Sequence, residues 1–169
     1  SGLMLLRRLA AVAPPPDRHR ALDEVETSVV VFAVFDRVLL TVHPSDCAVR
    51  EFFAQRLAAL AGGSEGRSAT RMPASPADLM LRMVNHMVDR YLDLRRLLTR
   101  QFGHVQQELF NPRSNFNNWQ LLLESRNAMH LLEDICEDQR SAIVEWIDAL
   151  DEWPDETDPA AQRDRELLR

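Results

Sequence analysis

Residues 83–110 read MVNHMVDRYLDLRRLLTRQFGHVQQELF, a stretch that contains no proline and a single glycine. Its apolar residues belong to a series spaced alternately by four and three positions: Met80, Val84, Met87, Tyr91, Leu94 and Leu98. Such a heptad seam is typical of a helix that packs along its length against another helix. Phe102, Val105 and Leu109 continue the seam with one irregular step. The stretch therefore predicts a long helix with one buried face.

The two ends of this helix also have sequence signals. Ser75 is placed to act as the N-cap, Pro76 suits the first helical position, and Asp78 lies near the positive end of the helix dipole. The sequence NPRSN at 111–115 interrupts the pattern. We therefore expect the helix to run from residue 76 to about residue 110.

A second long helix is predicted to begin near Ser114 or Asn115. Five residues recur every seven positions and are expected to form its buried face: Leu122, Met129, Cys136, Ile143 and Leu150. Leu132 and Trp146 extend the same face, whereas Ser125 and Gln139 leave it partly polar. Two long helices joined by a short connection predict an antiparallel α-hairpin over residues 76–152.

The N-terminal 75 residues have a different pattern. Three runs predict strands, at 3–12, 27–35 and 36–44, and the last two are rich in β-branched and aromatic residues. The last two runs meet at Phe35-Asp36-Arg37, which leaves room only for a tight turn and so predicts an antiparallel hairpin. A helix is expected over 46–61 with Ser45 as its N-cap, followed by a loop over 62–75. The predicted fold class is therefore α+β, a small antiparallel sheet with a helix followed by the long α-hairpin.

Composition excludes several classes of protein. The net charge of −6 argues against general nucleic-acid binding, which needs a basic surface to neutralise phosphates. The sequence has no run of about 18 apolar residues, so it predicts no membrane-spanning helix. Cys47 and Cys136 lie far apart, outside any metal-ligand pattern, and are expected to be buried thiols in a reducing compartment.

The sequence has no recognisable catalytic motif. A Gly-rich phosphate loop, a Cys-x-x-Cys pair, a His-Glu-x-x-His helix and a Gly-x-Ser-x-Gly elbow are all missing from the sequence. None of the histidines stands at metal-ligand spacing, and all are expected to be structural or exposed: His19, His43, His86, His104 and His130. The sequence therefore favours a protein that is not an enzyme.

Charge is distributed unevenly between the two long helices. Between residues 133 and 158 there are eleven acidic residues and one arginine, Arg140. These acids are Glu133, Asp134, Glu137, Asp138, Glu145, Asp148, Asp151, Glu152, Asp155, Glu156 and Asp158. A solvated helix face is the favoured interpretation, and a surface that collects hard divalent cations is the alternative. The arginine-rich first helix, over 82–100, is expected to pair with these acids across the hairpin.

Several segments resemble the cytoplasmic part of the CorA-type divalent metal ion transporters. They are VLLTVHP at 38–44, LMLRMVNHMVDRYLDLRRLL at 79–98, and the second long helix that follows. In that family a strand ending in Thr-Val-His precedes a helix, and a long helix carries an apolar-Val-Asp-x-Tyr segment. Met87-Val88-Asp89-Arg90-Tyr91 matches that segment here. The resemblance extends over residues 27–169.

This resemblance implies an organisation and a location. Residues 1–75 would be part of an α/β sandwich, 76–152 the α-hairpin, and 153–169 a linker and the start of a stalk helix at Pro159. Family members are homopentamers of the bacterial inner membrane, and this domain lies on its cytoplasmic side. The pore, its Gly-Met-Asn signature and the membrane helices would lie downstream of this chain. The strand at 3–12 would be an exposed edge able to pair with another copy.

The leading hypothesis is therefore a soluble cytoplasmic regulatory domain of a CorA-like transporter. It implies Mg²⁺, or Co²⁺ or Zn²⁺, as the transported or regulatory ion, and no other cofactor. No residue is assigned as a metal ligand, because no position of this chain matches a metal-site motif of the family. The alternative is a stand-alone helical module that binds a partner protein through its heptad faces.

Overall fold

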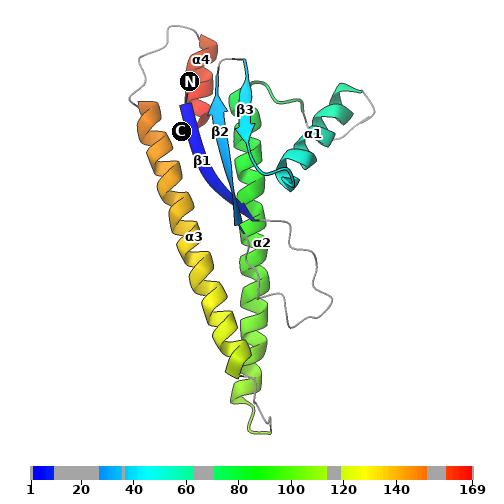
Figure 1. Cartoon of the computed structure of the whole chain (residues 1–169), viewed down its shortest axis with the longest axis vertical. Coiled ribbons are helices and arrows are strands. Elements are labelled where there is room, and N and C mark those ends of the chain that lie inside the picture. The colour runs from blue at the N-terminus through cyan, green and yellow to red at the C-terminus, as the bar shows by residue number, and fades with distance from the viewer. Residues whose placement is uncertain are drawn as a thin grey trace.

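The computed structural model describes residues 2–9, 27–35, 37–62, 71–113, 119–151 and 159–168. The chain forms a small sheet beside two long helices, with two shorter helices at the sheet end of the molecule (Figure 1). The elements are β1 (Gly2–Leu9), β2 (Thr27–Val34), β3 (Leu39–Val42), α1 (Ala48–Ala61), α2 (Pro76–Phe110), α3 (Trp119–Asp151) and α4 (Pro159–Leu168). The predicted α+β class is confirmed.

The sheet is antiparallel, with the strand order β1-β2-β3. Val34 pairs with Leu39, and the backbone N–H of Phe35 donates to the carbonyl oxygen of Val38 at 2.9 Å. This confirms the predicted hairpin, although β3 is shorter than 36–44: it begins at Leu39, after the Phe35–Val38 contact, and ends at Val42. β1 lies at one edge of the sheet, where α3 contacts it. The expectation that this edge is exposed stays a prediction, and residues 10–12 lie outside the described part of the chain.

One face of the sheet packs on the helices. Val30, Phe32 and Val34 alternate along β2 and are buried, as the two-residue period of a strand requires. They share a core with residues from all four helices, including Val49, Phe53, Met80, Met87, Trp146, Leu150 and Leu168. The sheet, α1, α2, the C-terminal half of α3 and α4 are therefore held by one hydrophobic core.

α1 begins later than the sequence indicates. Its N-cap position is Cys47, whose side chain forms no capping hydrogen bond, so the prediction that Ser45 caps a helix starting at 46 is wrong. Cys47 is only 3% exposed and has an extended backbone conformation. Burial of this thiol in the core sets the start of the helix and leaves Ser45 in the preceding turn.

α2 confirms the predicted long helix at both ends. The Ser75 hydroxyl accepts a hydrogen bond from the Asp78 backbone N–H at 3.2 Å, and Pro76 occupies the first turn. The Asp78 carboxylate in turn accepts from the backbone N–H of Ala74, the residue before the N-cap, at 2.9 Å, so side chains on both sides of the cap fix the start of the helix. The buried residues of α2 include most of the predicted seam: Met80, Val84, Met87, Tyr91, Leu98 and Val105.

α3 confirms the second arm of the hairpin, and its predicted buried face is confirmed at Leu132, Trp146 and Leu150. The buried residues are Ser125, Ala128, Leu132, Ile135, Trp146 and Leu150. Met129 is 45% exposed and Cys136 is exposed, so the predicted series is wrong at both positions. Ala128 packs with Tyr91 and Leu98 of α2 in a second, smaller cluster. The Ser125 hydroxyl can be buried because it donates to the carbonyl oxygen of Leu121 at 2.7 Å.

α4 begins at Pro159, as the sequence predicts. It lies beside the N-terminal end of α2 and near the C-terminal end of α3 (Figure 1). Its residue Leu168 is buried in the common core. The last described helix is therefore packed on the body of the domain.

Candidate functional site

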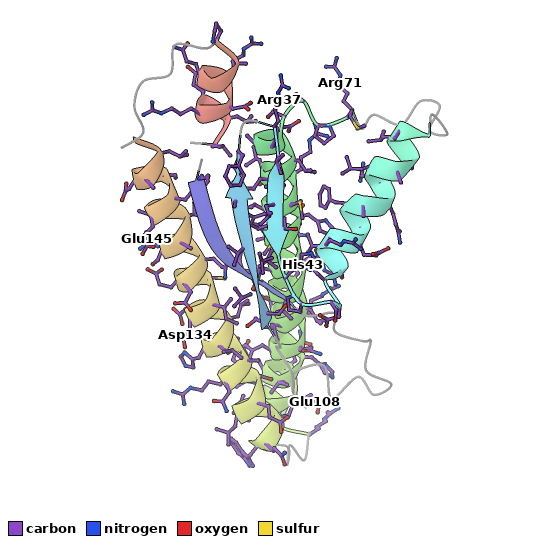
Figure 2. All side chains as sticks on the ribbon, turned by 45° about the horizontal axis from the view of Figure 1, so that its top comes forward. Arg37, His43, Arg71, Glu108, Asp134 and Glu145 are labelled. Atoms are coloured by element: carbon purple, nitrogen blue, oxygen red, sulfur yellow. The ribbon has the colours of Figure 1, made fainter. Side chains whose placement is uncertain are left out.

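The acidic residues of α3 form an exposed face. Within the described residues this face comprises Glu133, Asp134, Glu137, Asp138, Glu145 and Asp148. Asp134 and Glu145 point away from α2 (Figure 2). The other predicted acids are Asp151, whose side chain is not described, and those at 152–158, which lie outside the described residues.

Two carboxylates of this face have partners on the same helix. Glu137 accepts two hydrogen bonds from Arg140, at 2.9 and 3.0 Å, and these bonds lower the pKa of the Glu137 carboxyl. Glu133 lies 3.6 Å from Nδ1 of His130. Within the described residues, no three His, Cys, Asp or Glu side chains come together in an arrangement that could hold a metal ion. One copy of the acidic face is thus a charged surface rather than a built metal site.

The arginines of α2 also form their ion pairs locally. Arg82 binds Asp78 through two hydrogen bonds of 2.9 Å, and Arg96 binds Asp93 at 3.1 Å. Among the described residues, every ion pair that α2 and α3 form joins two positions of the same helix. For the described residues the predicted pairing across the hairpin is therefore wrong. Its physical reason is that the apolar seam occupies the contact between the helices and leaves most charged side chains on outward faces.

His86 joins α1 to α2. Its ring stacks on Phe52 with centroids 4.5 Å apart and an angle of 4°, and it meets Phe53 edge-on at 5.8 Å. Burial lowers the pKa of His86, and the nearby charges of Arg90 and Arg56 lower it further against the opposing charge of Asp89. A neutral imidazole is thus favoured where α1 docks. His104 and His130 are exposed, His43 is partly buried like His86, and His19 lies outside the described residues.

A small pocket of about 290 Å³ opens beside this histidine, between α1 and α2. Its lining includes Phe52, Phe53, Arg56, Arg82, His86 and Asp89. Arg56 also lies over the ring of Phe52 at 5.7 Å from its centroid. The stacking of His86 on Phe52 could not be predicted from local sequence patterns, because the two residues are more than 30 positions apart. Because Arg56 and Arg82 line this pocket together with Asp89, it favours neither an anionic nor a cationic ligand.

A larger hollow of about 750 Å³ runs between α2 and α3, and we call it the hairpin groove. Its apolar lining comes from Leu98 and Phe102 of α2 and from Leu122, Met129, Leu132 and Cys136 of α3. Polar and charged residues complete it: Arg95, Thr99, Arg126, His130 and Glu133. Three of the residues predicted to pack against α2, Leu122, Met129 and Cys136, thus line an open groove. Both cysteines are free, and the expectation that Cys136 is buried is wrong.

The fold and these surfaces define a mixed sheet-and-hairpin domain with outward-facing charge and an open apolar groove. The family model for CorA-like Mg²⁺ transporter protein matches residues 11–167, and the chain therefore belongs to this family. Comparison with curated proteins gives no match. Over the described residues, no helix is both long enough and apolar enough to cross a bilayer.

Proposed function

We propose that this chain is the cytoplasmic regulatory domain of a CorA-like divalent metal ion transporter, and that it gates transport rather than catalysing a reaction. The observation that carries the proposal is the family match over residues 11–167, nearly the whole chain. The long α-hairpin and the small sheet are also what the resemblance to the cytoplasmic part of these transporters implies. The pore and the membrane helices of the transporter are proposed to belong to other parts of the polypeptide.

The proposed assembly is a homopentamer at the cytoplasmic side of the bacterial inner membrane. A divalent cation, Mg²⁺ or alternatively Co²⁺ or Zn²⁺, would bind between neighbouring copies and favour one arrangement of the ring. Such an ion shifts the equilibrium only by the difference in its affinity for the two arrangements. The exposed carboxylates of α3 supply oxygen ligands of the kind that hard cations prefer. A second copy would be needed to complete the ligand set.

The common core gives a route by which such binding acts at a distance. Met87 of α2, Trp146 of α3 and Leu168 of α4 are buried in one cluster with the inner face of the sheet. A tilt of the hairpin therefore requires either repacking of this cluster or movement of α4 with it. We propose that α4 is the start of the stalk that transmits this movement towards the pore.

The complete gene that encodes this chain provides the test. The proposal expects two apolar segments of about 20 residues each after Arg169, with Gly-Met-Asn at the end of the first. It also expects that the gene product restores growth in low Mg²⁺ to a bacterium lacking its own Mg²⁺ uptake systems. A gene without such segments would favour the alternative, a stand-alone helical module that binds another protein.

A further inference from the structure

The hairpin groove presents a second apolar seam of α3 to solvent. Leu122, Met129 and Cys136 recur every seven residues, and all three line the groove. Met129 is among the exposed large hydrophobic residues, and Cys136 is exposed. A seven-residue apolar repeat on the open side of a helix is the pattern that receives another helix. The seam that packs α3 against α2 is a different one, formed by Ser125, Ala128, Leu132 and Ile135.

Charged residues alternate with the apolar ones along this second seam. In order they are Leu122, Arg126, Met129, Glu133 and Cys136, with steps of four, three, four and three. Arg126 forms no ion pair within the described part of the chain. Glu133 has only the 3.6 Å contact with His130 there. The seam therefore offers one cation and one anion, symmetrically placed on either side of Met129.

Two copies of this seam are complementary to each other when they run antiparallel. Leu122 and Cys136 each lie seven residues from Met129, which is about 10 Å along a helix axis. Arg126 and Glu133 lie three and four residues from it, or about 5 Å and 6 Å. An antiparallel copy of α3 that crosses at Met129 would therefore set Arg126 opposite Glu133, twice, and Leu122 opposite Cys136, twice. A parallel copy would instead oppose Arg126 to Arg126 and Glu133 to Glu133.

We propose that the hairpin groove is a docking surface for α3 of a second copy of this chain, antiparallel to the first, with Met129 at the two-fold axis. Charge complementarity and the seven-residue repeat favour this occupant, because every residue of the seam meets an apolar or oppositely charged counterpart. A two-fold contact of this kind is complete when two copies have associated. It is therefore separate from any ring around a pore and does not rest on the proposed function.

Disulfide trapping of the full 169-residue chain tests this geometry. Met129→Cys in a Cys136→Ser background is expected to cross-link to itself under mild oxidation, since the two residues meet at the axis. Leu122→Cys, with Cys136 retained, is expected to cross-link to Cys136 of the second copy. The unsubstituted chain should stay uncross-linked, because its two Cys136 residues would lie about 20 Å apart. Leu131→Cys in the Cys136→Ser background is the control, since Leu131 is exposed on α3 but does not line the groove.

Charge reversal gives an independent readout by sedimentation equilibrium. Arg126→Glu and Glu133→Arg are each expected to weaken the pair about tenfold, and the double substitution should restore the affinity of the unsubstituted chain. Cross-linking of unsubstituted Cys136 to itself would overturn the antiparallel arrangement. A chain that stays monomeric at all concentrations, with no cross-link at positions 122 or 129, would overturn the proposal and leave the groove to a different partner.

Discussion

Neighbouring leucines on α3 provide a sharp test of how the hairpin packs. Leu132 is 8% exposed and belongs to a cluster with Tyr91, Leu98, Ala128 and Ile135. Leu131, the residue before it, is 44% exposed. The same substitution at both positions changes intrinsic helix propensity equally, so the difference between them reports burial alone.

Leu132→Ala is expected to lower the free energy of unfolding by about 3 kcal/mol. Buried Leu→Ala substitutions cost about 2–5 kcal/mol. A value in the middle of this range is expected, because the cluster around Leu132 is small. Leu131→Ala should cost less than about 1 kcal/mol, because nearly half of that side chain is in water in the folded state. Urea unfolding followed by circular dichroism at 222 nm measures both values. Equal losses, or a larger loss at Leu131, would refute the assigned buried face of α3.

Four further predictions concern caps, protonation and metal. Ser75→Ala should destabilise the chain by about 1 kcal/mol in urea unfolding, because it removes the hydroxyl that accepts from Asp78, whereas Ser45→Ala should change stability by less than about 0.5 kcal/mol. Burial raises the pKa of Asp78, but the Arg82 side chain and the Ala74 backbone N–H together hold it below its usual value. The folded state therefore gains stability above the unfolded pKa of Asp78 and loses it as pH falls through the folded pKa; Asp78→Asn should be less stable at pH 7 and less sensitive to acid in pH-dependent urea unfolding. Burial lowers the pKa of His86 below its usual value of 6.5, so folding favours the neutral imidazole. This contribution to stability is complete above pH 6.5 and is lost as pH falls through the lower pKa of the folded state. His86→Phe should reduce the loss of melting temperature between pH 7 and pH 5, whereas substitution of the exposed His104 by Phe should leave that loss unchanged. Millimolar Mg²⁺ should raise the melting temperature of the isolated chain no more than NaCl of equal ionic strength, and a larger, saturable rise would reveal a metal site within one copy.

Local signals were sufficient to predict α2. Its N-terminal cap depends on Ser75, Pro76 and Asp78, which lie within four residues, and its seam is a long, regular repeat. The same holds for the β2–β3 hairpin, where two apolar runs meet at a short turn. In these elements the sequence pattern and the tertiary packing favour the same conformation.

Tertiary packing decided two features that the sequence did not predict, the buried face of α3 and the start of α1. α3 carries two apolar seams, and a seven-residue repeat of large apolar residues selects Leu122, Met129 and Cys136, whereas the small Ala128 is buried instead. The choice between them depends on how closely α2 approaches, which no local pattern records. The start of α1 is similar, since burial of Cys47 overrides the capping preference of Ser45.

The charged surfaces show the same limit. Composition located the acids of α3 and the arginines of α2, but it could not tell whether they face each other. Because the apolar contact between α2 and α3 leaves most of these charged side chains on outward faces, they pair within one helix, as Arg140 does with Glu137. Charge that is left facing outwards is available to other copies, to ions or to solvent.

Gating of metal transport by this domain is the central proposal. The direct measurement is Mg²⁺ influx into liposomes that contain the complete gene product, read by a Mg²⁺-sensitive dye, with Mg²⁺ varied on the side that the domain faces. We expect influx driven by external Mg²⁺ that falls steeply as Mg²⁺ on the domain side rises, and a weaker response when the acidic residues of α3 are replaced by their amides. Absence of influx, or influx with the same response in both proteins, would contradict the account.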